Sequence, residues 1–147
     1  MAVTTTVRVR YAETDQMGVV YYANYLVWFE VGRVEYLRGL GYDYRQMEET
    51  DGAILPVVEA NCRYRAPARY DDLIEIEASP ILLRGAVLKF GYRIYRAATE
   101  AAERQLLAEG ETTHVVCDRE LNKRPLPERV AEPMRRAIHA LKHPAEV

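Results

Sequence analysis

Apolar and polar side chains alternate along five segments of the chain, which is the pattern of β-strands. In one of them, Leu88, Phe90 and Tyr92 occupy every second position, with polar residues or glycine between them. Short polar connections join these segments, which favours antiparallel pairing of the strands. The five predicted strands are residues 3–11, 55–65, 73–78, 87–96 and 105–117.

The spacing changes to steps of three and four between residues 23 and 40, which predicts a long α-helix. Trp28 and Tyr36 fall on its apolar stripe, and Leu26 and Leu37 widen that stripe. A helix that is apolar on more than one side is expected to be covered by more than a neighbouring helix. Two further helices are predicted, at residues 42–49 and 127–142.

The order of elements is one strand, a long helix, four strands and a terminal helix, which is typical of the α+β class. We expect residues 1–147 to form one domain, in which a five-stranded antiparallel sheet curls around the long central helix. Gly32 on the helix and Gly110 on the last strand are expected where helix and sheet approach closely, because a glycine inside an element otherwise weakens it.

Composition excludes several classes of function. The 20 basic and 22 acidic residues give a net charge of −2, which is not the basic footprint of a nucleic-acid-binding protein. No run of about 18 apolar residues predicts a membrane span, and the first residues do not resemble a signal peptide. Cys62 and Cys117 are too few for a disulfide framework and show no zinc-ligand spacing. We therefore expect a cytoplasmic protein without a resident metal.

One carboxylate is placed where it could take part in catalysis. Asp15 lies in a polar loop with Gly18, a few residues before the N-terminus of the long helix. The first turn of a helix offers unpaired N–H groups and a positive dipole end, which can stabilise an oxyanion on a carbonyl. A nearby carboxylate can attack that carbonyl or deprotonate a water that does. The pattern indicates acyl transfer, although an aspartate near a helix start also serves as a cap or a solvated charge.

The segment from Tyr11 to Tyr25 resembles the signature of the 4-hydroxybenzoyl-CoA thioesterase family, the hotdog-fold acyl-CoA thioesterases. That signature is an aromatic residue followed by T/C-D-x-x-G-x-V-x-Y/H-x-N-Y. Residues 29–37 and 66–72 resemble the central helix and the hairpin segment of the same family. Residues 114–118 and 123–127 resemble its last strand and the exit from that strand. The likeness covers roughly residues 5 to 130.

The resemblance implies hydrolysis of an acyl-CoA whose acyl group is small or medium in size, aromatic groups included. It places the catalytic carboxylate at Asp15, as nucleophile or general base, and the oxyanion donor at the backbone N–H of Tyr22. No metal or redox cofactor is implied, since the CoA thioester is the substrate. Only Arg84 is basic in the segment that holds CoA phosphates in some relatives. The expected substrate contacts are Gly18, Tyr25, Trp28 and Arg84.

Other interpretations of the sequence stay open. Glu30 and Glu35 are alternative carboxylates on the helix, although pairs with arginines three residues away account for them. His114 is expected to be a buried, hydrogen-bonded histidine. A non-catalytic acyl-CoA-binding module and a hotdog dehydratase are alternative functions, the latter disfavoured because no histidine stands near the helix start. Hotdog relatives pair through a continuous sheet, so we expect a homodimer and, from it, a homotetramer.

Overall fold

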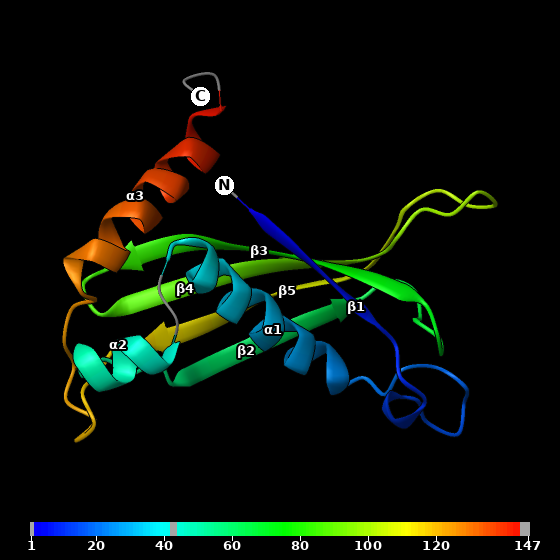
Figure 1. The fold of residues 1–147 in the computed structure, drawn as a ribbon, viewed down its shortest axis with the longest axis horizontal. Helices are drawn as coiled ribbons and strands as arrows, with labels where there is room; N and C mark the ends of the chain where they lie inside the picture. Colours follow the sequence, from blue (N-terminus) through cyan, green and yellow to red (C-terminus); the bar gives the residue numbers. More distant parts are fainter. Residues whose placement is uncertain (1, 42–43, 145–147) are drawn as a thin grey trace.

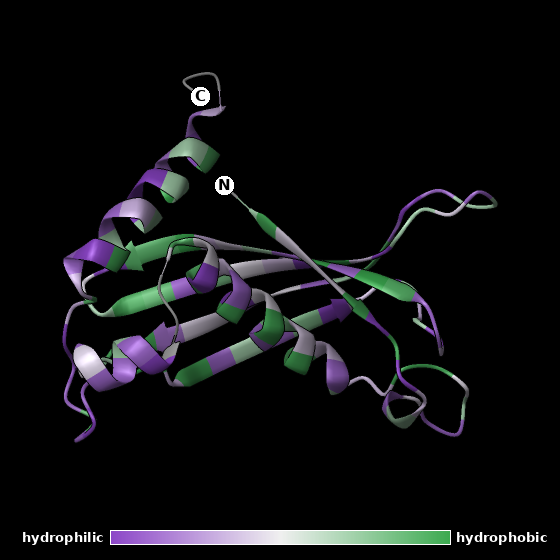
Figure 2. Ribbon diagram, viewed as in Figure 1, coloured by the Kyte–Doolittle hydropathy of each residue, from purple (hydrophilic) through white to green (hydrophobic). Residues whose placement is uncertain are grey.

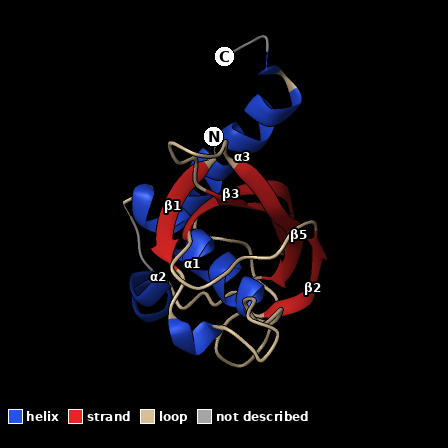
Figure 3. Cartoon of the chain, turned by 90° about the vertical axis from the view of Figure 1, so that its right-hand side faces the viewer, coloured by secondary structure: helices blue, strands red, loops and turns tan. Residues whose placement is uncertain are grey.

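The sheet and its central helix form the body of the molecule. The computed structural model describes residues 2–41 and 44–144. The elements are β1 (Val3–Arg8), a 3-10 turn η1 (Tyr11–Glu13), α1 (Asn24–Gly39), α2 (Tyr44–Thr50), β2 (Val57–Tyr64), β3 (Leu73–Arg84), β4 (Val87–Arg96), β5 (Gln105–Val115) and α3 (Glu128–Lys142). The strands pair antiparallel in the order β1-β3-β4-β5-β2 (Figure 1). Seen from the end, the sheet curls around α1 (Figure 3), so the expected α+β hotdog architecture is confirmed.

The bounds of β2 and β5 differ from the prediction by at most two residues, whereas β1 and β3 end further from the predicted positions. The prediction that β1 reaches Tyr11 is wrong, because Tyr11 is 78% exposed and begins η1. The chain turns there because the Arg10 N–H donates to Oε1 of Glu13 and the Glu13 N–H donates to the Arg10 carbonyl. β3 continues to Arg84 through Pro80, where its register against β4 shifts. Such an irregularity accommodates a residue that has no N–H to donate.

Helix α1 packs one side against the sheet. Its ring residues Trp28 and Phe29 are buried, and Phe29 stacks on Tyr92 of β4 with ring centroids 4.3 Å apart. Figure 2 shows green apolar and purple hydrophilic residues alternating along this helix. Leu26 and Val27 are about half exposed, so the expectation that Leu26 widens the buried stripe is wrong. The second predicted helix is present as α2, while residues 42 and 43 lie outside the described part of the chain.

The two glycines mark close approaches, as expected. A Cβ on Gly32 would lie 2.7 Å from Cγ2 of Ile76 and 3.1 Å from Cβ of Ala78, both on β3. A Cβ on Gly110 would clash with the backbone carbonyl oxygen of Asn61 on β2 and would lie 2.9 Å from the Phe29 ring on α1. These distances are shorter than a carbon–carbon contact tolerates, so α1 can lie in the curled sheet only because both positions lack a side chain.

Strand β2 forms one edge of the sheet and is open to solvent on both faces. Seven of its eight residues are exposed, and Cys62 is half-buried. Helix α3 packs against β3 through Val130, Ala131 and Met134. Among the described helices, none is both long and apolar enough to cross a membrane.

Candidate active site

The loop after η1 is closed by its own backbone. The Asp15 N–H donates to the Val19 carbonyl at 2.9 Å, and the Gly18 N–H donates to the Asp15 carbonyl at 3.0 Å. Gly18 has a φ of 80°, a conformation that side chains with a Cβ rarely adopt. This tight turn explains why glycine stands three residues after the aspartate.

The Asp15 carboxylate is oriented within this loop. Its Oδ1 accepts the Met17 N–H at 2.9 Å, an interaction between residues two apart that is typical of an Asx turn. Among the hydrogen bonds of the described residues, none uses Oδ2 of Asp15. One carboxylate oxygen is therefore held, and the other is available to a substrate or a water.

The junction from the loop to α1 is fixed at the Glu13 carbonyl. This carbonyl accepts both the Tyr21 N–H and the side-chain Nδ2 of Asn24, each at 2.9 Å. The Asn24 N–H donates in turn to the Tyr21 carbonyl at 2.9 Å. The asparagine of the signature thus has a structural role. Asn24 is the first residue of α1, and its side chain bonds the start of the helix to Glu13, which precedes the Asp15 loop.

Two backbone N–H groups at this junction are unused. Within the described part of the chain, no hydrogen bond is recorded for the N–H of Tyr22 or of Ala23. Ala23 is the N-cap of α1 and offers no side-chain acceptor. Both amides stand at the positive end of the helix dipole, where a negative charge on a ligand oxygen is stabilised.

A cavity of about 340 Å³ joins the acid and this helix start. Asp15 and Tyr22 both line it, so the structure brings the two predicted catalytic groups to one place. Most of the remaining wall is aliphatic or aromatic, which suits the acyl part of a thioester better than its phosphates. The other lining residues are Met17, Val19, Val20, Tyr25, Tyr64, Arg65, Ala66 and Pro67.

Of the four predicted substrate contacts, Tyr25 alone lines this cavity. Gly18 shapes the loop beneath it, and Trp28 is buried behind Tyr25, with their ring centroids 4.9 Å apart. Arg84 lies at the far end of β3 from the Asp15 loop (Figure 1), so this chain does not bring Arg84 to its own cavity. A contact between Arg84 and CoA stays a prediction.

Glu30, Glu35 and His114, for which the sequence favoured a structural role, do not line the cavity. Glu35 forms an ion pair with Arg38 on the helix surface. His114 is fully buried and bonded through both ring nitrogens, to Thr112 Oγ1 at 2.8 Å and to the Leu55 carbonyl at 3.0 Å. This confirms the interpretation of His114 as a buried, hydrogen-bonded residue.

Sequence reasoning missed Tyr64 and Pro67 as cavity residues. Both lie at or just after the end of β2, about 45 residues beyond the Asp15 loop, and only the curl of the sheet brings them there. The signal that could have found them is the resemblance of residues 66–72 to the family's hairpin segment, which adjoins Tyr64. Partial burial raises the pKa of Tyr64 well above its usual range, so its hydroxyl is a hydrogen-bond donor at neutral pH.

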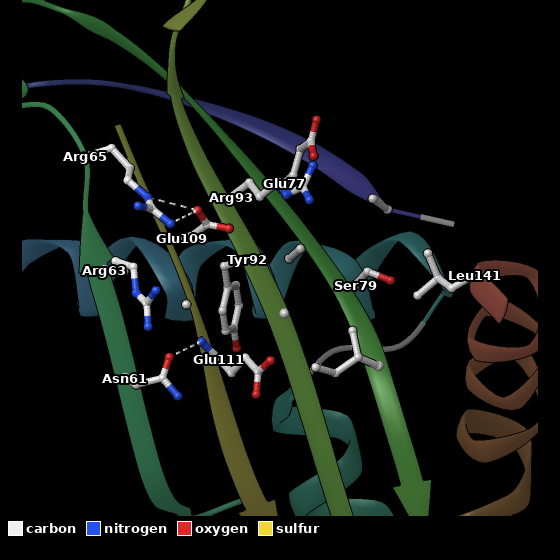
Figure 4. Close-up of a pocket in the computed structure, with 15 residues that line it drawn as sticks. Asn61, Arg63, Arg65, Glu77, Ser79, Tyr92, Arg93, Glu109, Glu111 and Leu141 are labelled. Atoms are coloured by element: carbon white, nitrogen blue, oxygen red, sulfur yellow. Dashed lines mark hydrogen bonds and ion pairs between the residues drawn. The ribbon is translucent and has the colours of Figure 1, made fainter. Parts of the chain in front are cut away.

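A second, larger cavity of about 540 Å³ lies on the outer face of the sheet, away from α1. Figure 4 shows arginines of β2 and β4 beside glutamates of β3 and β5, with Leu141 of α3 at one side. Arg65 forms an ion pair with Glu109 at 3.0 Å across this face. Charged side chains of both signs line this cavity, whereas aliphatic and aromatic residues make up most of the wall of the Asp15 cavity.

The comparisons with known proteins agree with this geometry. Residues 9–134 match the family model described as the Thioesterase-like superfamily. The chain belongs to this family. It is 40% identical to the Bacillus subtilis protein YneP over 114 residues, which is 78% of each chain. It is 38% identical over 119 residues to the Escherichia coli acyl-CoA thioester hydrolase YbgC, covering 81% of this chain and 84% of that one.

A solved structure extends the likeness over nearly the whole chain. The 1,4-dihydroxy-2-naphthoyl-CoA thioesterase from Synechocystis superimposes with a TM-score of 0.79 at 29% identity. The alignment covers 98% of this chain and 100% of that one. The expected family and the expected class of enzyme, a thioester hydrolase acting on acyl-CoA, are therefore confirmed.

Proposed function

We propose that this protein hydrolyses an acyl-CoA thioester, with Asp15 as its catalytic carboxylate and the backbone N–H of Tyr22 as the oxyanion donor. The observation that carries the proposal is the shared cavity, in which the acid and the helix start with its unused amides meet beside an apolar wall. Family membership supports the reaction class, and the cavity supports these residues as the groups that perform it.

The chemistry follows from charge. The thioester carbonyl oxygen lies at the Tyr22 N–H, so the negative charge that develops in the tetrahedral intermediate is stabilised by the amide and the helix dipole. Asp15 either attacks the carbonyl carbon or removes a proton from the attacking water. If water attacks, its oxygen forms the new C–O bond as the C–S bond breaks, and its protons are shared between the leaving thiol and the solvent. If Asp15 attacks, the C–S bond breaks as an acyl–Asp15 anhydride forms, and a water then hydrolyses that anhydride and regenerates the Asp15 carboxylate. By either route the products are CoA as its thiol and the acyl group as a free carboxylate.

The proposed substrates carry a small or medium acyl group, aromatic groups included. A cavity of about 340 Å³ walled by Tyr22, Tyr25 and Tyr64 fits such a group, and the Synechocystis relative acts on an aromatic acyl-CoA. The CoA phosphates stay outside the cavity. If Arg84 binds them, it belongs to a second copy of the chain, because the Arg84 of the same chain lies at the other end of β3.

We further propose a cytoplasmic homodimer that assembles into a homotetramer and needs no metal or redox cofactor. The open edge of β2 supports the pairing, and the hollow outer face of the sheet supports the second association. Two cysteines without a disulfide suit a reducing compartment. Among the described residues, no three His, Cys, Asp or Glu side chains are grouped so that they could hold a metal ion.

The decisive experiment measures CoA release with a thiol reagent on a panel of acetyl-, hexanoyl-, decanoyl- and benzoyl-CoA. Asp15→Asn keeps the shape of the carboxylate and removes its charge, so kcat on the best substrate should fall on the order of 10²-fold or more. Asp71→Asn is the matched control, because Asp71 is exposed and lies outside the cavity. Dialysis against EDTA should leave the wild-type rate unchanged.

The rival functions give different results in the same assay. Stoichiometric binding of an acyl-CoA without CoA release would support the non-catalytic module. Addition of water to an enoyl-CoA would support the dehydratase. An Asp15→Asn variant that turns over as fast as the wild type would remove Asp15 from the mechanism.

A further inference from the structure

The hydroxyl of Tyr64 reaches from the end of β2 to the turn before α1. Its Oη donates to the backbone carbonyl of Tyr22 at 2.9 Å, joining residues 42 positions apart in the sequence. Tyr22 is the residue whose N–H is proposed to bind the thioester oxygen. The sheet therefore contacts the oxyanion donor's own residue through one side-chain hydrogen bond.

This bond acts on the peptide group that links Tyr22 to Ala23. The Tyr22 carbonyl also accepts the Tyr25 N–H, but at the longer distance of 3.3 Å. A hydrogen bond at a carbonyl polarises the whole peptide group, so the N–H on its other side, here that of Ala23, becomes a stronger donor. The same bond fixes the rotation of this group about Tyr22, and with it the direction of the neighbouring amides.

The other side of Tyr22 is held by its own segment. The Tyr21 N–H donates to the Glu13 carbonyl, and the Tyr21 carbonyl accepts the Asn24 N–H. Tyr21 is thus anchored without help from the sheet. Among the hydrogen bonds recorded for the described residues, the one from Tyr64 is the bond that connects the Tyr22 carbonyl to the sheet.

The orientation of the Tyr64 side chain is fixed by its packing against Tyr25. Its ring meets the Tyr25 ring edge to face, with centroids 5.0 Å apart and planes at 90°. The Tyr25 hydroxyl accepts the Ala68 N–H at 3.2 Å, which fixes the Tyr25 ring in turn. The Tyr64 phenol keeps its proton at neutral pH and remains a donor. The ring of this partly exposed side chain is therefore held by Tyr25, and its hydroxyl points at the Tyr22 carbonyl.

We propose that Tyr64 is a positioning residue for thioester hydrolysis, whose hydroxyl orients and polarises the peptide group between Tyr22 and Ala23. The inference rests on the proposed function, because this peptide group carries the Ala23 N–H and adjoins the Tyr22 N–H that is proposed to bind the thioester oxygen. The bond is well suited to catalysis and poorly suited to holding the fold. Tyr64 is 44% exposed on an edge strand, where a neutral hydrogen bond contributes little to folding.

Tyr64→Phe tests the proposal, since it removes the hydroxyl and keeps the ring that contacts Tyr25. On the acyl-CoA of the panel with the highest kcat/KM, kcat should fall on the order of 10-fold while KM stays within about twofold. The expected loss is smaller than that of a direct oxyanion donor, which is on the order of 10²-fold or more. Tyr70→Phe is the matched control, because Tyr70 is exposed and lies outside the cavity. It should keep the wild-type kcat.

A second readout separates positioning from folding. The same acyl-CoA bound to Asp15→Asn protein should show a thioester carbonyl stretch lowered in the infrared by hydrogen bonding to the helix-start amides. Adding Tyr64→Phe to that variant should move the stretch back toward its value in free acyl-CoA. The melting temperature should stay within a few degrees of the parent.

The outcomes distinguish this inference from the proposed function. If Asp15→Asn abolishes hydrolysis while Tyr64→Phe keeps the wild-type kcat, the role of Tyr64 is wrong and the proposed function stands. A lowered kcat with an unmoved carbonyl stretch, or with a large loss of melting temperature, reduces Tyr64 to a structural residue. Wild-type turnover by Asp15→Asn would overturn both.

Discussion

At the scale of single residues, His114 is the buried group whose protonation the fold opposes. Its Nδ1 faces the Leu55 carbonyl, which can only accept, so Nδ1 carries the proton of the neutral ring. Nε2 must then accept from Thr112, whose oxygen lies 2.6 Å from the Tyr92 hydroxyl. Tyr92 in turn accepts from Nη1 of Arg33 at 3.0 Å. The chain of donors runs in one direction, from Arg33 through the neutral ring of His114 to the Leu55 carbonyl.

We predict that this network makes the protein less stable in mild acid. Burial first, and the charge of Arg33 in addition, lower the pKa of His114 to about 4 from a usual value of about 6.5. Between these values the unfolded chain binds a proton that the folded chain does not. His114 therefore contributes stability above pH 6.5 that is lost as the pH falls to about 4, by up to ~1.4 kcal/mol per pH unit.

Urea unfolding at several pH values between 7 and 4.5 measures this effect. His114→Gln should be less stable than the wild type at pH 7, yet its free energy of unfolding should fall less steeply toward acid. His143→Gln, which changes an exposed histidine, should keep the wild-type slope. Equal slopes for the wild type and His114→Gln would show that His114 is not the group that titrates.

The sequence predicted that Asp15 lies beside the start of α1, but not the contacts around it. Asp15, Gly18 and Asn24 lie in one short signature, and local hydrogen bonds fix their roles. Tyr64 acts across a distance that only the curled sheet closes, and no local pattern encodes it. Arg84 is the opposite case. The family resemblance predicted that it contacts the substrate, but it lies far from the cavity of its own chain.

At the scale of elements, the fit of α1 into the sheet depends on Gly32. We predict that Gly32→Ala lowers the free energy of unfolding by about 1–2 kcal/mol. The new methyl group would lie 2.7 Å from the buried Ile76 side chain, and such overpacking costs about 1–3 kcal/mol. The higher helix propensity of alanine offsets at most about 1 kcal/mol of that cost.

Gly39→Ala in the same helix is the matched control. Its Cβ would meet only Cγ2 of Val3, at 4.0 Å, so alanine gains propensity there without a clash. Chemical denaturation should show Gly39→Ala at least as stable as the wild type and Gly32→Ala clearly weaker. If the two variants have the same stability, the close packing of α1 on β3 does not limit the fold.

Element types followed from periodicity, while several boundaries did not. The alternation in β4 predicted its span as observed, since both neighbours of that strand in the sheet pair along it. The alternation of apolar and polar residues continues past the end of β1. The chain nevertheless leaves the sheet there, because the hydrogen bond between Arg10 and Glu13 turns it. β3 was predicted too short, because Pro80 suggests an end and the structure absorbs it as an irregularity of register.

At the scale of the whole molecule, the open edge at β2 is the place where a second chain can extend the sheet. An edge strand exposed on both faces presents unpaired backbone groups and apolar side chains, here Val57 and Val58, about half exposed. Tyr64 ends the same strand and lines the cavity. Pairing of two β2 edges would thus bring a second chain beside each site and give Arg84 of that chain a path to the CoA phosphates.

We predict that Val58→Arg weakens this association, because a charge on an edge strand opposes pairing. Light scattering at micromolar concentration should show the wild type at the mass of two or four chains and the variant shifted toward one. The KM for acyl-CoA should rise in the same variant, since each site loses what the second chain supplies. Ala102→Arg adds the same side chain to an exposed loop between β4 and β5 and should change neither mass nor KM. A wild-type protein with the mass of a single chain would contradict the pairing, and unchanged mass in Val58→Arg would move the interface away from β2.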